Sequence, residues 1–207
     1  MTRLLAGGKV TLIVAALSTI LSLFLGLIYG GISGYFGGRI DSLLMRLLEV
    51  FLTIPSLLII LVFQAFMQGS VWSILLIIGL TSWYTTARIV RTEFLKLSQL
   101  EFVQVAKMIG TPVWKILVSH LLRNSMEAVF VVTLFNFAGA IFIEVSLSFL
   151  GIGVSPAVPS WGNMLFHAQS DFITGAWWVG IFPGLLIMFT VLSINIIGSS
   201  TFRTKRG

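Results

Sequence analysis

Long runs of apolar residues alternate along the chain with short polar connections. A helix needs about 17–25 mostly apolar residues to cross about 30 Å of hydrocarbon, because it rises 1.5 Å per residue. Five segments meet this requirement, at residues 10–32, 50–67, 71–87, 128–149 and 177–197, and the second extends back through residue 43. We therefore predict an all-α polytopic membrane protein with about five transmembrane helices in a single domain over residues 1–207.

The composition supports this class and excludes others. Hydrophobic residues make up 57% and charged residues 10% of the chain, against about 45–50% and 25% in soluble domains, which excludes a water-soluble globule. The absence of cysteine rules out disulfides, thiolate metal sites and a cysteine nucleophile. We predict no metal site, since His167 and Asp171 have no third ligand nearby. Gly7, Gly8 and Lys9 lack the spacing of a phosphate-binding loop, so we predict no ATPase activity and no cofactor in this chain.

The net charge of +6 indicates orientation rather than nucleic-acid binding, because Lys and Arg of short loops stay on the cytoplasmic side. One side of a five-span arrangement collects Arg39, Arg46, Arg88, Arg91, Lys96, Lys107, Lys115, Arg123, Arg203, Lys205 and Arg206. The central loop and the C-terminus are therefore predicted to be cytoplasmic, and the N-terminus, with Arg3 and Lys9, external. Such an N-terminus is an awkward start for membrane insertion. We hypothesise that the chain is a shortened six-span protein, with a genuine five-span protein as the alternative.

The one long polar stretch, residues 88–127, carries a helix-turn-helix pattern over residues 98–122. Ser98 and Glu101 have the spacing of a capping box, which predicts that a helix begins there. One face of this helix collects the apolar residues Phe102, Val105, Ala106 and Ile109. The spacing predicts a short amphipathic helix that packs on this face.

A second short helix is predicted after a turn. Gly110 suits the left-handed residue past a helix end, and Thr111 with Pro112 suits the N-cap and first position of the next helix. One side of that helix presents Val113, Ile116, Leu117 and His120. The two helices form either a docking surface for another protein or a pair lying in the lipid headgroup layer. Periodicity alone leaves both interpretations open.

Three stretches of this sequence resemble the membrane subunits of ABC importers. The cytoplasmic coupling motif of that family resembles EFVQVAKMIGTPVWKILVSHLLRN, and segments of its peptide and nickel branch resemble EVSLSFLGIGVSPAVPSWGNML and GYFGGRIDSLLMR. The resemblance implies a multi-pass permease of the bacterial inner membrane that forms half of a translocation path for peptides. It implies as partners a second permease subunit, two cytoplasmic ATPase subunits that bind the ATP and an extracytoplasmic substrate-binding protein, but no nucleic acid.

The resemblance also assigns an ATPase-coupling role to Glu101, Val105, Ala106, Gly110, Ile116, His120 and Asn124. Val105 stands where the family usually has alanine, and Arg123 stands where it has proline. The missing proline would let the second helix run on toward the fourth span. The family's first span and the acidic-and-arginine motif before its second span have no counterpart in the chain, and IIGSSTFRTKRG lacks the family's Asp. The absence of the first span and of the acidic-and-arginine motif agrees with the hypothesis of a shortened chain.

Ionisable and helix-breaking residues inside the predicted spans suggest either a translocation-path or a packing role. Glu144 is a pathway residue or proton relay, or a group near the outer end of its span that fixes packing, which we favour. Pro55 and Pro183 should kink their spans, as gating hinges or as static bends. Two alternative functions follow: a self-contained secondary transporter or channel that uses Glu144, and a truncated non-transporting subunit. The first would be expected to carry more intramembrane ionisable residues and an internal repeat.

Small residues recur at every fourth position near the first span. Gly26, Gly30, Gly34 and Gly38 have the spacing that lets helix backbones approach closely. We favour an internal neighbour over a partner permease as the helix that crosses there, and we expect the last two glycines to lie in the following loop.

The predicted outer loop, residues 151–175, contains a turn and a short helix. Pro156 and Pro159 indicate the turn, and Trp161 is expected to anchor the helix at the membrane interface. By resemblance, this extracytoplasmic loop faces the binding protein, with possible contacts at Trp161, Asn163 and Asp171.

Overall fold

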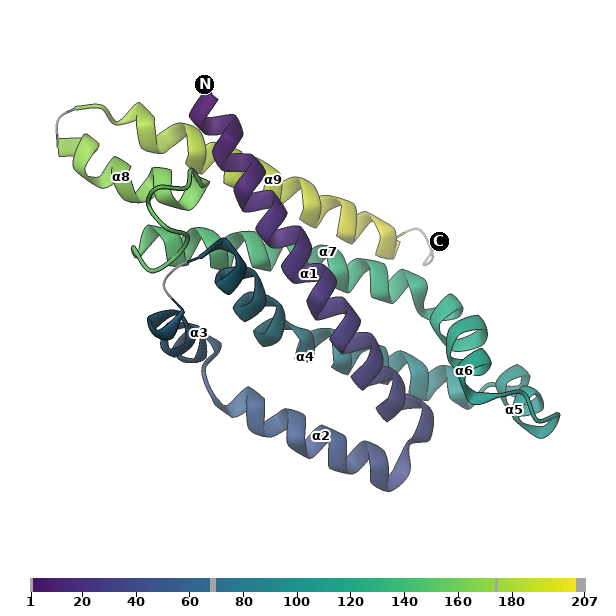
Figure 1. The fold of residues 1–207 in the computed structure, drawn as a ribbon. Coiled ribbons are helices and arrows are strands. Elements are labelled where there is room, and N and C mark those ends of the chain that lie inside the picture. Colours follow the sequence, from purple (N-terminus) through teal and green to yellow (C-terminus); the bar gives the residue numbers. More distant parts are fainter. Residues whose placement is uncertain (1, 68–69, 174, 204–207) are drawn as a thin grey trace.

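The computed structural model describes residues 2–67, 70–173 and 175–203, and every regular element within these ranges is helical (Figure 1). The elements are α1 (Thr2–Phe36), α2 (Gly38–Thr53), α3 (Ser56–Phe66), α4 (Val71–Ser98), α5 (Glu101–Met108), α6 (Val113–Lys115), the π-helical segment η1 (Ile116–Leu122), α7 (Arg123–Phe149), α8 (Trp161–Ile173) and α9 (Trp178–Arg203). The prediction of an all-α protein is confirmed.

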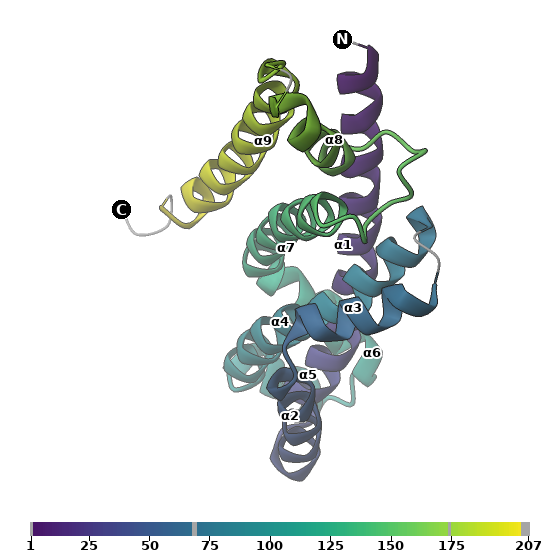
Figure 2. The ribbon, with the colours of Figure 1, turned by 90° about the vertical axis from the view of Figure 1, so that its left-hand side faces the viewer.

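The long helices α1, α4 and α7 run between two ends of the molecule, and short helices mark those ends (Figures 1 and 2). α8 and the N-terminus lie at one end, which we call the α8 end. α5 and α6 lie at the opposite end, which we call the α5 end. The predicted coupling loop (residues 98–122) and the predicted outer loop (residues 151–175) are therefore separated by the full length of these helices.

Four helical segments are long and apolar enough to cross a membrane, at Thr2–Phe36, Val71–Ser98, Val113–Phe149 and Trp178–Ser200. The second predicted span, residues 50–67, differs, because α2 and α3 meet at a bend of 74°. Pro55 causes this break: it lacks an N–H, and the preceding Ile54 is extended (φ −89°, ψ 123°), as residues before proline prefer. The expected kink is thus a complete interruption, and α2 and α3 are long and apolar enough for a further span only when taken together. Pro183, by contrast, lies inside the continuous helix α9.

Glycines of α1 allow a close crossing with α4. A Cβ atom added to Gly30 would lie 2.3 Å from the carbonyl oxygen of Ala87, and one added to Gly34 would lie 2.7 Å from that of Arg91. The prediction that these glycines serve an internal neighbour is confirmed. The expectation that Gly34 lies in a loop is wrong, because α1 continues to Phe36; Gly38 begins α2 with φ 53°. The close approach to α4 holds this extra helical turn in place.

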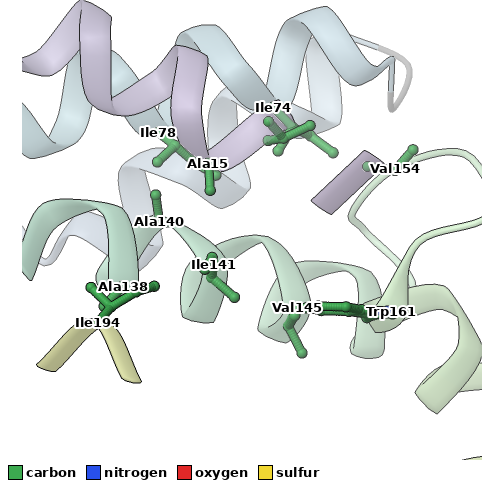
Figure 3. Packing of buried hydrophobic residues seen from close by; sticks show 11 residues of the cluster. Ala15, Ile74, Ile78, Ala138, Ala140, Ile141, Val145, Val154, Trp161 and Ile194 are labelled. Atoms are coloured by element: carbon green, nitrogen blue, oxygen red, sulfur yellow. The ribbon is translucent and has the colours of Figure 1, made fainter. Parts of the chain in front are cut away.

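The main hydrophobic core lies where α1, α4 and α7 meet (Figure 3). Ala15 of α1 and Ile78 of α4 face Ala140 of α7, and Ile194 of α9 packs beside Ala138. A separate cluster at the α5 end joins α4, α5, η1 and α7 through Val90, Phe94, Val103, Ala106, Ile116, Leu121 and Val129. This second cluster fixes the position of the predicted coupling helices.

Candidate coupling site

The first coupling helix, α5, packs on the second cluster. The face that it buries differs from the one that the apolar spacing predicts. Val103 and Ala106 are its buried residues. Three of the four residues predicted to share the packed face, Phe102, Val105 and Ile109, are exposed instead. Apolar residues lie on both sides of this short helix, so tertiary packing against α4 and η1 decides which side is buried.

The predicted capping box does not form. α4 runs on to Ser98, whose hydroxyl donates a hydrogen bond to the carbonyl oxygen of Leu95 at 2.9 Å. α5 begins after Leu100, which makes no side-chain cap. Gln104 ties the two helices together instead, since its Nε2 donates to the Ser98 carbonyl oxygen at 2.8 Å. Glu101 is exposed at the first position of α5.

The turn after α5 is a Schellman motif, which agrees with the left-handed residue predicted at Gly110. Gly110 has φ 77°; its N–H donates to Lys107 O at 3.1 Å, and the N–H of Thr111 donates to Ala106 O at 3.0 Å. No atom lies within 4 Å of a Cβ added to Gly110. Glycine is therefore required here for backbone conformation and not for space.

The second coupling helix begins at Val113 with Pro112 as its N-cap, one residue later than predicted. It passes through η1 directly into α7, so residues 113–149 form one continuous helical segment. This is the continuation expected from Arg123 in place of proline. π-Helical turns are rare and often mark functional sites. Asn124 supports this one, because its Nδ2 donates to the His120 carbonyl oxygen at 2.5 Å.

Coupling residues of the second helix divide between the core and the surface. Ile116 is 1% exposed and belongs to the second cluster. The His120 ring lies beside that of Phe102 on α5, with ring centroids 6.1 Å apart. The two coupling helices therefore contact each other by side chains as well as through the turn.

Large apolar side chains remain uncovered on the outer side of this element. We define the coupling surface as the exposed residues Phe102, Val105, Met108, Ile109, Val113 and Trp114. Met108 is 81% and Ile109 76% exposed. Apolar groups gathered in this way on a rigid helix-turn-helix typically mark an interaction site.

An ion pair that the sequence did not reveal fastens the α1–α2 corner to α4, next to the coupling helices. Arg91 donates to both carboxylate oxygens of Asp41, from Nε at 2.6 Å and from Nη2 at 2.5 Å, and the Ser33 hydroxyl donates to the same carboxylate. Lys107 of α5 lies 4.9 Å above the ring of Tyr35, near the end of α1. Asp41 falls within the quoted stretch GYFGGRIDSLLMR, but its partner is 50 residues away, so no local spacing relates them.

Glu144 lies toward the α8 end and is fully buried. Its carboxylate accepts hydrogen bonds from the hydroxyls of Thr11 and Ser148, each at 2.9 Å. The Thr11 hydroxyl in turn accepts a hydrogen bond from the backbone N–H of Trp161, the first residue of α8, and the Ser148 hydroxyl accepts one from the N–H of Val154 in the preceding loop, both at 3.2 Å. This chain of hydrogen bonds ties α1, α7 and the loop together, which is the arrangement that a packing role requires.

Two of the residues suggested to contact a binding protein point inward. Trp161 is 5% exposed, packs over Gly8 of α1 and donates from Nε1 to Leu4 O at 3.1 Å, so it anchors α8 to α1 and not to a membrane interface. Asn163 is 4% exposed and donates from Nδ2 to the carbonyl oxygens of Val154, Ser155 and Val158. Their side chains shape the loop from within, whereas Asp171 of α8 is half-buried. Within the described ranges, no three His, Cys, Asp or Glu residues gather as a metal site.

The architecture defines a class: a multi-pass helical membrane protein with a rigid helix-turn-helix at one end. It matches that of transporter subunits, since a chain of the MetNI methionine ABC transporter superposes with a TM-score of 0.80 (14% identity, 99% of this chain and 96% of that one). A chain of an amino acid ABC transporter gives 0.66 (14% identity, 98% and 94%). At such low identity these likenesses establish the fold alone.

Sequence comparison identifies the family. Residues 22–203 match the family described as "Binding-protein-dependent transport system inner membrane component", and the chain belongs to it. The dipeptide transport system permease protein DppC of Bacillus subtilis (strain 168) is 35% identical over 197 residues, which are 95% of this chain and 62% of that protein. The oligopeptide transport system permease protein OppC of Haemophilus influenzae is 33% identical over 96% and 63%. The chain thus spans less than two thirds of the length of these relatives.

Proposed function

We propose that this chain is a permease subunit of a binding-protein-dependent ABC importer for peptides, and that it forms half of the translocation path. Family membership supports the importer class, and the names of the dipeptide and oligopeptide relatives support peptides as the substrate. The partners are a second permease subunit, two ATPase subunits and a substrate-binding protein. The α5 end faces the cytoplasm in this proposal, and the α8 end faces the binding protein.

The coupling surface carries the proposal. Met108 and Ile109 are too exposed to be explained by packing within the chain. Behind them, Val103 and Ala106 are fixed in a core shared with α4 and α7. A movement of an ATPase bound to this surface would therefore be passed directly to α7, because the second coupling helix continues into α7. Binding that differs in free energy between two packings of the spans is sufficient to drive the exchange between them.

The alternative of a self-contained transporter with Glu144 as a proton relay has less support. Glu144 has 0% exposure, and its carboxylate accepts hydrogen bonds from the hydroxyl of Thr11 on α1 and from that of Ser148 on its own helix, α7. A proton relay also needs water or further ionisable groups that lead to and from the carboxylate. Within the described residues, Glu144 does not line the hollow between α3 and the loop after α7, the groove beside α4, the hollow near Arg3 or the one on α2.

A photo-crosslinker placed at Met108 in the assembled importer tests this proposal. The matched control is a crosslinker at Phe189, an exposed residue of α9. The proposal predicts a covalent adduct with the ATPase subunit from Met108 and none from Phe189. Lipid adducts alone from both positions would instead support helices that lie in the headgroup layer.

A further inference from the structure

Glu144 is a buried acidic residue whose charge no cation compensates. Within the described ranges, no Lys, Arg or His forms an ion pair with its carboxylate. The hydroxyls of Thr11 and Ser148 donate to one carboxylate oxygen each, and the hydroxyl of Ser160 interacts with the same group. A carboxylate that only accepts hydrogen bonds is in its ionised form. A buried charge is costly unless hydrogen bonds and dipoles replace its hydration, so other groups of the chain must compensate this one.

The compensating groups lie at the N-terminal end of α8. The Thr11 hydroxyl accepts the N–H of Trp161 at 3.2 Å, and the Ser160 hydroxyl accepts that of Asn163 at 3.1 Å. Both N–H groups belong to the first turn of α8, where the helix itself offers no acceptor. The positive end of the α8 dipole therefore lies one hydroxyl away from the carboxylate of Glu144, which is the arrangement that stabilises an anion.

Close backbone contacts keep α8 and the loop before it at this place. A Cβ atom added to Gly162 of α8 would lie 2.9 Å from the carbonyl oxygen of Val145, and one added to Gly153 of the loop would overlap the backbone of Ser148. Val145 and Ser148 belong to the same part of α7 as Glu144. The loop and α8 thus pack without intervening side chains on the turn of α7 that carries the charge.

The same contact connects the two ends of the subunit. Residues 113–149 form one helical segment, which runs from the second coupling helix to the turn that holds Glu144. Beyond this turn, Pro156, Ala157 and Pro159 of the loop are exposed. They belong to the α8 end, which faces the binding protein in the proposed function. Glu144 therefore lies between the helix that is joined to the coupling surface and the exposed loop.

We propose that Glu144 is a positioning residue, whose negative charge holds the N-terminal end of α8 and the loop at residues 150–160 in the position in which the substrate-binding protein docks on them. This inference rests on the proposed function, and the residue acts through α8 and not on the substrate. The charge is required as well as the shape. A glutamine amide has the same size, but it offers one acceptor oxygen where two hydroxyls donate, and it adds N–H donors.

Amide hydrogen exchange in the assembled importer measures the hold on α8. Glu144→Gln removes the charge and keeps the size of the side chain. Loss of a hydrogen bond to a charged group shifts an equilibrium about tenfold or more. Because exchange reports the opening equilibrium even when the open form is rare, the amides of Val154, Trp161 and Asn163 should exchange at least about tenfold faster than in the wild type.

Two threonine variants provide a second test and its control. Thr11→Val removes one hydroxyl donor of Glu144 and should accelerate exchange of the same amides at least about threefold; it repeats the measurements if Glu144→Gln fails to assemble. Thr86→Val is matched, since both threonines are 0% exposed. It removes the hydrogen bond that Asn136 of α7 donates to Thr86 of α4 at 2.7 Å, far from α8. Exchange at α8 should stay at the wild-type rate.

Binding-protein-stimulated ATP hydrolysis in proteoliposomes tests the function of this position. Glu144→Gln should raise the concentration of peptide-loaded binding protein that gives half-maximal stimulation at least about threefold, and leave the maximal rate within about twofold of the wild type. The reason is that a surface less often in position weakens docking and not the steps that follow it. Thr86→Val should change neither value.

Three results would overturn the inference. One is unchanged amide exchange, and another is fast exchange with an unchanged half-maximal concentration. The third is a lower maximal rate alone, which would assign Glu144 to the translocation path. If Glu144→Gln behaves like the wild type while a crosslinker at Met108 still captures the ATPase, this inference fails and the proposed function stands. Loss of the Met108 adduct would contradict the proposed function instead.

Discussion

Replacing Gly110 with valine isolates the contribution of the coupling turn. Gly110 has φ 77°, and open space surrounds the position of its missing Cβ. The substitution therefore introduces backbone strain without a steric clash with neighbouring residues. An L-residue in the left-handed region costs about 1–2 kcal/mol, and a β-branched residue lies at the upper end of this range.

This strain translates into a defined loss of coupling. A cost of about 1–2 kcal/mol lowers the population of the native turn about 5–30-fold relative to alternatives. Because only the correctly folded turn presents the coupling surface, apparent affinity for the ATPase falls in proportion to the fraction of native turn, and by the full factor where the native turn is the minor conformer. We expect peptide uptake and peptide-stimulated ATP hydrolysis in proteoliposomes to fall together. Gly110→Asn should be milder, since asparagine tolerates this conformation better.

The chain offers a matched control at the opposite end. Gly175 has φ 89° and equally open surroundings, so Gly175→Val introduces comparable strain away from the coupling surface. Gly139→Ala, inside α7 with open space around it, controls for a change of glycine in general. Uptake by Gly110→Val within about twofold of the wild type, or an equal defect in Gly175→Val, would refute the reasoning, because strain of this size must shift the turn.

Three further substitutions test the buried contacts. Asp41→Asn should lower the free energy of unfolding by about 1.5–3 kcal/mol, because it removes charged hydrogen bonds to Arg91. Glu93→Gln, which breaks the surface ion pair between Lys96 and Glu93 (3.0 Å), should cost about 0–1 kcal/mol; unfolding in detergent compares the two variants. Glu144→Gln should leave the pH dependence of uptake unchanged, and a shifted profile would favour a proton relay. Gly30→Val should prevent assembly, measured by gel filtration, because its Cβ would lie 2.3 Å from a backbone oxygen of α4; normal assembly would contradict the close crossing.

Local patterns sufficed for four of the five predicted spans and for the coupling turn. Apolar runs predicted the membrane helices, because each run must satisfy its backbone within one helix. Gly110 was predictable because glycine past an amphipathic helix favours a left-handed cap. The missing proline at Arg123 predicted the continuous helix into α7.

Long-range packing decided what local patterns could not. Ser98 has the spacing of a capping box, but α4 extends through it and takes up its hydroxyl. Periodicity does not distinguish Val103 from Val105 as the buried residue of α5, because only the cluster from α4 and α7 selects between them. The partners Asp41 and Arg91 are likewise joined only by the fold. Trp161 and Asn163 are typical surface anchors by type, yet both are buried by α1 and their own loop.

The most direct test of the coupling surface is the amount of ATPase that co-purifies with Met108→Asp. If Met108 is buried in a groove of the ATPase, losing its apolar contact costs about 1.5–3 kcal/mol, before the cost of burying a carboxylate. We therefore predict at least about tenfold less bound ATPase for Met108→Asp, with normal binding for Met108→Leu and for Phe172→Asp at the α8 end. Wild-type amounts of ATPase on Met108→Asp would contradict the assignment of this surface to coupling.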